Sequence, residues 1–243
     1  MHSVSVVLTS CDRFDLLELT LESFFEFNTY AIKQFIIIED SPYIDKLKDC
    51  LNKFDYDFTV IWNNPRLGQL KSIDKAYSEV TSDYIFHCED DWKFHKKGFI
   101  EACLTPLISN DKILNVWLRH RSELKDSLFG ESEVTVSDTS YYLVNDEIFS
   151  FNPTIIRMSD YKKVMPYFNF TKTMEPGLSN FFMEQGYFSI LVKDGFVEHE
   201  GWHRHVLNEE KKHRSNMSHK FHNISKKYKS KVYKFFKLKH FKK

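Results

Sequence analysis

The chain has 243 residues, of which 42% are apolar, so it is long enough to bury the core of one sizeable domain. Its 34 basic and 34 acidic residues cancel, but 14 of the basic ones lie from Arg204 onward, against only Glu209 and Glu210. The remaining 20 basic and 32 acidic residues make the preceding body acidic, which argues against a nucleic-acid-binding protein.

The first part of the chain alternates strand and helix patterns. Residues 4–9 form a β-branched apolar run typical of a buried parallel strand, and apolar residues from Phe14 to Phe25 then recur at helical spacing. Ser41 and Pro42 fit the cap and the first position of a second helix. Further strands are expected at 35–38, at 59–62 and from Tyr84, with a helix over about 69–80.

Four such strand-and-helix units predict an α/β domain with a mostly parallel sheet and helices on both faces. Each strand ends in polar residues, and open α/β sheets bind ligands at the carboxyl ends of their strands. The chain contains neither GxGxxG nor GxxxxGK[ST], so a phosphate group must be held in another way.

Three adjacent carboxylates, Glu89, Asp90 and Asp91, follow the fourth strand directly. They repel one another unless a cation lies among them. Mg2+ or Mn2+ would supply that cation and would also hold a diphosphate. The alternative is a solvated acidic turn. We favour the metal, because the triplet lies at the ligand-binding edge of the sheet.

The second half of the chain is less regular. Residues 119–140 are polar and show no clear helix or strand pattern, which suits a loop. Pro153 argues that a strand over 149–157 is an edge strand or contains a bulge. The other expected elements are a helical stretch through Phe99 and Leu107, strands at 113–118, 141–144 and 187–192, and a helix that includes Tyr161, Val164 and Met165.

A helix start with an acidic residue is expected near Glu175. Pro176 fits the first position of a helix that runs to Gln185 and stops at Gly186. Glu175 would then be the cap, extended because it precedes proline, with its carboxylate pointing out of the helix start. The alternative is that Glu175 only interacts favourably with the helix dipole. Glu184, later in the same helix, is a second candidate for a functional carboxylate.

Three histidines, His199, His203 and His205, stand near Glu198 and Glu200 and have metal-ligand character. A nitrogen ligand would favour Mn2+ over Mg2+. The alternative is a structural histidine. A zinc site is disfavoured, because no cysteines accompany the cluster.

The first 95 or so residues resemble a GT-A glycosyltransferase of the family 2 type. The resemblance is carried by the segments VSVVLTSCDR, IIIEDS, NNPRLGQLKSIDKAY and YIFHCEDDW. It implies that the acidic triplet is an EDD variant of the DxD motif, in which Asp91 ligates the metal. The segment from His199 to Gly201 resembles the HxG that follows the last core strand in many GT-A enzymes, so His199 would complete the metal shell, with His203 second.

The resemblance also assigns roles in catalysis and donor binding. In inverting GT-A enzymes a carboxylate at a helix start deprotonates the acceptor hydroxyl, which makes Glu175 the candidate catalytic base. The residues that would bind the nucleotide-sugar donor are Thr9, Ser10, Asp12, Arg13, Glu39, Asp40, Ser41, Arg66, Gly68, Gln69, Ser72, Glu89 and Asp90.

The C-terminal tail, 206–243, alternates basic and apolar residues at helical spacing. This predicts a basic amphipathic helix that lies on an anionic membrane surface. A helix packed on the body, a solvated tail and a nucleic-acid patch are alternatives, of which the acidic body disfavours the last. The preceding residues, 1–205, would form the transferase domain, with a nucleotide-sugar half over about 1–95 and an acceptor half over about 96–205.

The cysteines indicate the compartment. Cys11, Cys50, Cys88 and Cys103 are scattered, which is typical of reduced thiols in a cytoplasmic protein. There is no signal-peptide pattern, and no apolar stretch approaches roughly 18 residues, so no transmembrane helix is expected. With the basic tail, this predicts a cytoplasmic protein that is peripheral on the inner face of the membrane.

Together these features predict a metal-dependent, inverting hexosyltransferase or N-acetylhexosaminyltransferase. Its donor would be a UDP-sugar and its acceptor a glycan or lipid-linked glycan, as in lipopolysaccharide or capsule synthesis. A sugar nucleotidyltransferase shares the sheet and the acidic site, but usually carries a Gly-rich loop near the first strand, whereas TSCDRFD has no glycine. A non-catalytic glycan- or membrane-binding module on the same fold is the third possibility.

Overall fold

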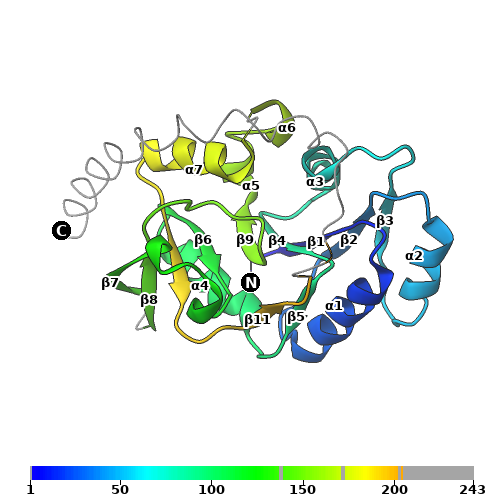
Figure 1. Ribbon diagram of the computed structural model, residues 1–243, viewed down its shortest axis with the longest axis horizontal. Helices are drawn as coiled ribbons and strands as arrows, with labels where there is room; N and C mark the ends of the chain where they lie inside the picture. The colour runs from blue at the N-terminus through cyan, green and yellow to red at the C-terminus, as the bar shows by residue number, and fades with distance from the viewer. Residues whose placement is uncertain (1, 137–138, 171–172, 202–203, 205–243) are drawn as a thin grey trace.

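The computed structural model describes residues 2–136, 139–170, 173–201 and 204, which form a mixed α/β fold (Figure 1). Its central five-stranded sheet has the order β3-β2-β1-β4-β9. Four of these strands pair in parallel, and β9 pairs antiparallel with β4 at the edge. The strands are β1 (Val4–Ser10), β2 (Gln34–Glu39), β3 (Thr59–Trp62), β4 (Tyr84–Glu89) and β9 (Thr154–Arg157). The expected mostly parallel sheet is confirmed.

Both faces of this sheet are covered, because the buried strands are apolar on both sides. Val6 and Leu8 share a core with Leu17 and Phe24 on one face, whereas Val7 belongs to the core on the other face. In Figure 1 the first two helices lie on the side of the sheet opposite to the third. The helices are α1 (Phe14–Phe27), α2 (Ile44–Leu51) and α3 (Gln69–Ser78).

A second sheet of four strands, in the order β6-β10-β8-β7, is built by the later residues. A short ribbon joins the two parts, since β5 (Trp92–Phe94) pairs antiparallel with β11 (Val197–His199). The other elements are α4 (Phe99–Ser109), β6 (Ile113–Trp117), the 3-10 turns η1 (Arg121–Glu123) and η2 (Asp126–Leu128), β7 (Phe129–Val136), β8 (Thr139–Val144), α5 (Met158–Tyr161), α6 (Tyr167–Phe170), α7 (Glu175–Glu184) and β10 (Phe188–Val192).

The start of the second helix was predicted wrongly. It begins at Ile44, with Tyr43 as the cap residue, and not at Pro42. The hydroxyl group of Ser41 accepts a hydrogen bond of 3.3 Å from the main-chain N–H of Tyr43. Ser41 and Pro42 therefore form a turn before the helix, because the serine side chain satisfies a nearer donor.

The later elements also differ from expectation. The strand expected over 149–157 shrinks to β9, because the N–H groups of Phe149 and Phe151 donate to the side chains of Ser179 and Glu175 instead of a strand. The polar stretch over 119–140 contains β7 and two 3-10 turns, whereas no regular element was expected there.

The helix expected to include Val164 and Met165 ends at Tyr161. Its last turn tightens, with the N–H of Val164 bonded to the carbonyl group of Tyr161 at 3.0 Å. The edge position that Pro153 suggested for the following strand is confirmed, since β9 is the last strand of its sheet.

All four cysteines are free, as expected from their spacing. Within the described part of the chain, no helix is both long and apolar enough to cross a bilayer. The amphipathic helix predicted over 206–243 lies outside the described residues, and so does His203.

His87 on β4 makes the stability of the protein depend on pH. Its side chain is fully buried against the rings of Tyr77 and Phe151, and neither ring nitrogen has a hydrogen-bond partner among the described residues. Burial lowers the pKa of His87 to about 3, whereas an unfolded histidine has a pKa of about 6.5. The contribution of His87 to stability is thus fully present above pH 6.5 and is lost as the pH falls toward 3. We expect the free energy of unfolding to be about 2 kcal/mol lower at pH 5 than above pH 6.5 because of this one residue.

Urea unfolding of wild type and His87→Leu at pH 7.5 and pH 5 measures this loss. The leucine variant lacks the titrating ring, so it should lose about 2 kcal/mol less than wild type between the two pH values. An equal loss in both proteins would show that His87 does not couple to unfolding.

Candidate active site at the carboxyl ends of the strands

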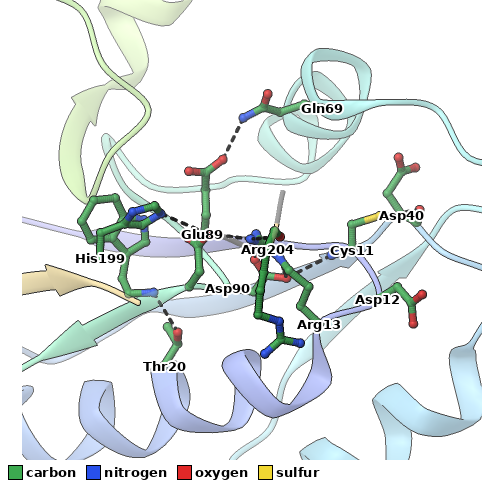
Figure 2. A network of polar contacts seen from close by, with 12 residues as sticks. Cys11, Asp12, Arg13, Thr20, Asp40, Gln69, Glu89, Asp90, His199 and Arg204 are labelled. Atoms are coloured by element: carbon green, nitrogen blue, oxygen red, sulfur yellow. Dashed lines mark hydrogen bonds and ion pairs between the residues drawn. The ribbon is translucent and has the colours of Figure 1, made fainter. Parts of the chain in front are cut away.

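The acidic triplet ends β4 and is held by a guanidinium group. Arg13, in the turn between β1 and α1, forms an ion pair with Asp90 Oδ1, and its Nη1 lies 2.6 Å from Asp91 Oδ2. Figure 2 shows Arg13 reaching across from its own turn to this group. The third carboxylate is turned elsewhere, because Glu89 Oε1 accepts a bond of 2.7 Å from Gln69 Nε2 on α3. Residues from three separate segments therefore meet at this edge of the sheet.

His199 approaches Asp91 from the opposite side. The β5–β11 ribbon sets His199 in register with Trp92, and the two rings lie 4.8 Å apart. His199 Nε2 is 3.2 Å from Asp91 Oδ2. The next two residues also contact Asp91, since the N–H of Glu200 donates to its main-chain carbonyl and Gly201 packs against its carboxylate.

Arg204 connects this corner of the site to α1. The main-chain carbonyl of Arg204 accepts a bond of 3.3 Å from Arg13 Nη1. The guanidinium of Arg204 makes two bonds, of 2.5 and 2.9 Å, to the carboxylate of Asp15 on α1. The side chain of Arg204 is about half exposed and that of Asp15 about two-thirds exposed, so this pair positions Arg204 more than it stabilises the fold.

The three carboxylates differ in their pKa values. Burial raises the pKa of Glu89 to about 8, and the negative charges of Asp91, Asp90 and Glu175 add to this effect. Burial also raises the pKa of Asp90 to about 7, against the opposing effect of the Arg13 charge. Burial acts on Asp91 too, but the hydrogen bond from His199 and the charge of Arg13 outweigh it and lower that pKa. Asp91 is therefore the member most readily ionised at neutral pH, and a cation bound there would ease ionisation of the other two.

Asp40, at the end of β2, organises the neighbouring loop. Its carboxylate accepts bonds from the main-chain N–H groups of Leu67 and Gly68, at 2.7 and 2.9 Å, and from the side chain of Asn63. Arg66 Nε lies 3.8 Å from the same group. Both oxygens of Asp40 are thus already in use, so this residue shapes the loop before α3.

Cys11 connects the two groups of residues. Its main-chain N–H donates to Asp90 Oδ2 at 3.2 Å, and its thiol donates to the main-chain carbonyl of Asp40 at the same distance. Figure 2 shows Cys11 between the two. The neighbouring Asp12 donates its N–H to Glu39 Oε1 at 3.0 Å. The ends of β1, β2 and β4 are therefore one continuous polar network.

Several oxygens of this network have unused acceptor capacity. Ser10 Oγ, Glu39 Oε2 and Asp91 Oδ1 are buried and have no hydrogen-bond partner among the described residues. They belong to the ends of β1, β2 and β4, respectively. Buried polar atoms are normally paired, so this edge of the sheet is suited to a ligand that would complete its bonds.

Glu175 lies at the start of α7, on the wall of a pocket. The structure corrects its expected position, since Met174 is the cap and Glu175 is the first helical residue. Glu175 Oε1 accepts a bond of 2.7 Å from the N–H of Phe151. Burial raises the pKa of Glu175, and hydrogen bonds to its carboxylate only partly oppose that effect. The pocket has a volume of about 320 Å³ and is also lined by Trp117 and Arg119.

The charge of Glu175 adds to the raised pKa of Glu89, so these two carboxylates lie near enough to interact electrostatically. Glu184, the rival carboxylate, is exposed at the other end of α7. Glu175 is therefore the acid of this helix that lies near the triplet.

Unfavourable backbone conformations mark the same region. Among the described residues, the non-glycine positions with positive φ are Asp12, Glu147 and Met174, at 54°, 55° and 52°. Asp12 precedes Arg13, Met174 precedes Glu175, and Glu147 lines the pocket. Such conformations cost of order 1 kcal/mol or more each and gather where function requires them.

The residues around Asp91 suit a divalent cation that takes only part of its ligands from the protein. No group of three or more His, Cys, Asp and Glu side chains among the described residues is arranged to enclose a metal. Asp91 and His199 nevertheless meet, and Asp91 Oδ1 is buried with an open acceptor position. Ions such as Mg2+ are often held by one or two carboxylates together with substrate phosphates. Asp91 and His199 would thus supply the protein ligands, and a bound diphosphate would supply the rest.

The structure brings most of the expected site residues to one edge of the sheet. Thr9 and Ser10 end β1, Ser41 follows β2, and Ser72 accepts a bond from Asn63 beside Asp40. Sequence reasoning did not find Cys11, Arg119 or Glu147. Arg119 was detectable, since it directly follows the strand expected over 113–118, whereas no local signal points to Glu147.

Comparisons with known proteins agree on the fold. The family model described as Glycosyl transferase family 2 matches residues 5–193. No curated protein matches the chain in sequence. A solved mannosyltransferase, PcManGT from Pyrobaculum calidifontis in complex with GDP-Man and Mn2+, is 10% identical with a TM-score of 0.57, over 80% of this chain and 55% of that one. GalNAc-T7 with UDP, GalNAc and Mn2+ is 13% identical with a TM-score of 0.62, over 82% of this chain and 44% of that one. The present chain thus matches about half the length of each solved protein.

Proposed function

The chain belongs to glycosyl transferase family 2 and has a GT-A fold, and from this premise we propose that it is a metal-dependent, inverting glycosyltransferase. The proposed donor is a nucleotide-sugar, most simply a UDP-sugar, and the proposed acceptor is a hydroxyl group of a glycan or lipid-linked glycan. The observation that supports this best is the buried Asp91 Oδ1 at the end of β4, which has no hydrogen-bond partner among the described residues, in a carboxylate that His199 contacts through its other oxygen.

The leaving group sets the main electrostatic demand. Transfer leaves a nucleoside diphosphate, whose developing negative charge must be stabilised. A divalent cation held by Asp91 and His199 would neutralise that charge. Mn2+ is the proposed ion, because a nitrogen ligand favours it over Mg2+. Arg13, which bridges Asp90 and Asp91, would keep both carboxylates in position for this role.

The donor would lie along the network at the ends of β1 and β2. Ser10 Oγ and Glu39 Oε2, which no described residue bonds, would offer buried oxygens to the nucleoside, near Thr9, Asp12 and Ser41. The loop that Asp40 shapes carries Arg66 and Gly68 toward α3. There Gln69 and Glu89, joined by their hydrogen bond, would contact the sugar.

The acceptor would occupy the pocket beside Glu175. As a carboxylate, Glu175 would take the proton from the acceptor hydroxyl while the oxygen attacks the anomeric carbon from the face opposite the diphosphate. Its raised pKa makes it a stronger base than an exposed glutamate, provided that it is ionised. A membrane-bound tail over 206–243 would bring acceptors of the lipopolysaccharide or capsule type to this pocket, and that part of the proposal rests on sequence alone.

Gly201 allows a test of the metal corner without changing a ligand. A Cβ added at Gly201 would overlap Asp91 Oδ2 and come within 2.8 Å of its Cγ, closer than real Cβ contacts. We expect Gly201→Ala to displace the Asp91 carboxylate and weaken Mn2+-dependent UDP binding at least about tenfold, since overpacking costs about 1–3 kcal/mol. Calorimetric titration measures this.

The matched control for Gly201→Ala is Gly98→Ala, at which an added Cβ meets no atom within 4 Å. Gly98 has a φ of 83°, so its alanine variant is expected to lower stability without altering UDP binding. Wild-type UDP affinity in Gly201→Ala would mean that Asp91 does not set the metal position.

The reaction itself is tested by incubating the purified full chain with Mn2+ and a panel of nucleotide sugars. Slow release of the nucleoside diphosphate supports the proposed transferase. Release of pyrophosphate would instead assign a nucleotidyltransferase, and no release with any donor would favour a binding module without catalysis. A parallel reaction with EDTA should abolish product formation.

A further inference from the structure

Three large apolar side chains are exposed together before α7. Met165, Phe168 and Phe170 expose 57%, 49% and 39% of their surface, whereas Tyr167 between them exposes only 1%. Tyr167 packs on the ring of Tyr161 at 4.8 Å. This segment therefore buries Tyr167 in the protein, and Phe170 also packs on the ring of Phe181 on α7 at 4.8 Å, while all three apolar side chains remain partly exposed. We call residues 165–170 the apolar wedge.

The wedge is fixed to the body by one carboxylate. Asp74 on α3 accepts hydrogen bonds from the N–H groups of Tyr167 and Phe168, at 2.8 and 2.9 Å, and from the hydroxyl group of Tyr161 at 2.8 Å. These bonds satisfy the donors at the start of α6. Asp74 thus fixes the main chain at the start of α6, where Tyr167 is buried and Phe168 is exposed.

The charge around the wedge is positive. Lys71 on α3 places its ammonium group 4.2 Å from the centre of the Phe168 ring, and Lys162 is exposed just before the wedge. The nearby acids are engaged, since Asp74 holds α6 and Asp160 pairs with Arg157 and Lys163. Apolar and aromatic side chains flanked by lysines suit the interface of an anionic bilayer, where the rings enter the headgroup region and the lysines meet lipid phosphates.

The wedge also lies beside the proposed catalytic region. Figure 1 shows α6 near α3 and α7, which begin at Gln69 and Glu175. Lys71 is two residues beyond Gln69, whose side chain contacts Glu89. A bilayer that met the wedge would therefore lie on the same side of the central sheet as α7, which carries Glu175.

We propose that the apolar wedge, with Lys71 and Lys162, docks the protein on an anionic lipid surface. A second copy of the chain suits this surface less well. Three side chains fall far below the roughly 800 Å² per partner of a stable interface, and the lysines of two such copies would repel one another. The proposal is independent of the catalytic assignment, because it depends only on this surface.

Vesicle cosedimentation of the full chain tests it. With vesicles of phosphatidylcholine and phosphatidylglycerol, the triple variant Met165→Ser, Phe168→Ser, Phe170→Ser should bind about tenfold more weakly than wild type. The control is Ile108→Ser, which removes a side chain with 47% exposure from α4 and should bind as wild type does. Any contribution of the basic tail is the same in all variants, so their differences report on the wedge.

The two lysines beside the apolar wedge are tested separately. Lys71→Gln with Lys162→Gln should lower binding to anionic vesicles about tenfold or more, at about 1 kcal/mol for each lysine. Binding to pure phosphatidylcholine should be much less affected. If the serine triple variant binds anionic vesicles as well as Ile108→Ser does, the wedge is not the docking surface.

A tryptophan reporter avoids any dependence on the triple variant folding. Fluorescence of Phe168→Trp should shift to the blue and be quenched by brominated lipids, whereas the matched Ile108→Trp should show neither change. An unquenched tryptophan at position 168 would overturn the proposal. A blue shift that appears with rising protein concentration and without vesicles would assign the wedge to a contact between two copies. Hydrolysis of the nucleotide-sugar donor without vesicles should be unchanged in Phe168→Trp and in Ile108→Trp. A loss of hydrolysis would therefore bear on the catalytic proposal and not on the docking surface.

Discussion

Asp91→Asn should reduce sugar transfer about a thousandfold or more and should abolish Mn2+-dependent binding of UDP. Asparagine keeps the shape of the side chain but removes the negative charge that a divalent ion requires. The loss corresponds to about 4 kcal/mol of transition-state stabilisation, a scale that fits the electrostatic role of a metal at a diphosphate leaving group. Initial rates over a range of Mn2+ concentrations, together with calorimetric titration of UDP, measure both effects.

The fold should survive this change, because the amide oxygen of the introduced asparagine could still accept hydrogen bonds from Arg13 and His199. Losing the charge beside Arg13 is expected to cost about 1–3 kcal/mol of stability, which urea unfolding would detect. Asp111→Asn is the matched control, since Asp111 is exposed in the turn before β6, outside the site. Transfer in Asp91→Asn that stays near wild type and still depends on Mn2+ would remove Asp91 from the metal site.

Glu175→Gln should leave donor binding intact while transfer falls about a hundredfold to ten-thousandfold, the usual contribution of a general base. The glutamine oxygen can still accept the N–H of Phe151, so α7 should keep its start. The pH profile offers a second readout. Because burial raises the pKa of Glu175, the acidic limb of the wild-type profile should lie above the usual pKa of a glutamate, and the variant should lack that limb.

Glu184→Gln is the matched control for this experiment. It makes the same chemical change at the exposed C-terminal end of the same helix. Its transfer rate should stay within about twofold of wild type, as expected for a surface substitution. Full transfer in Glu175→Gln, or a large loss in Glu184→Gln, would move the base away from the start of α7.

The parts of the fold that were predicted correctly have strong local patterns. The strands β1 and β2 are short, β-branched apolar stretches, a pattern that favours a buried strand, and in the structure their residues contribute to two cores on opposite faces. The predictions failed where side chains from distant segments compete for the backbone. The main chain at Phe149 and Phe151 bonds to Ser179 and Glu175, which no pattern around residue 150 reveals. The other error has a local cause, since the hydroxyl group of Ser41 accepts the N–H of Tyr43, two residues further on, instead of capping a helix.

The sequence by itself determined the α/β class, the acidic triplet at the end of β4 and the presence of a helix after residue 174, although it placed the first turn one residue too late. These follow from short-range patterns, in which hydrophobic periodicity and the residues at strand ends are sufficient. Only the tertiary structure decided how the charges are arranged. Arg13 and His199 lie 78 and 108 residues from Asp91 in the chain, yet both contact its carboxylate, because the ends of β1, β4 and β11 converge at one edge. The different pKa values of the three acids arise from that convergence, since burial and neighbouring charge depend on distances in space and not on distances along the chain.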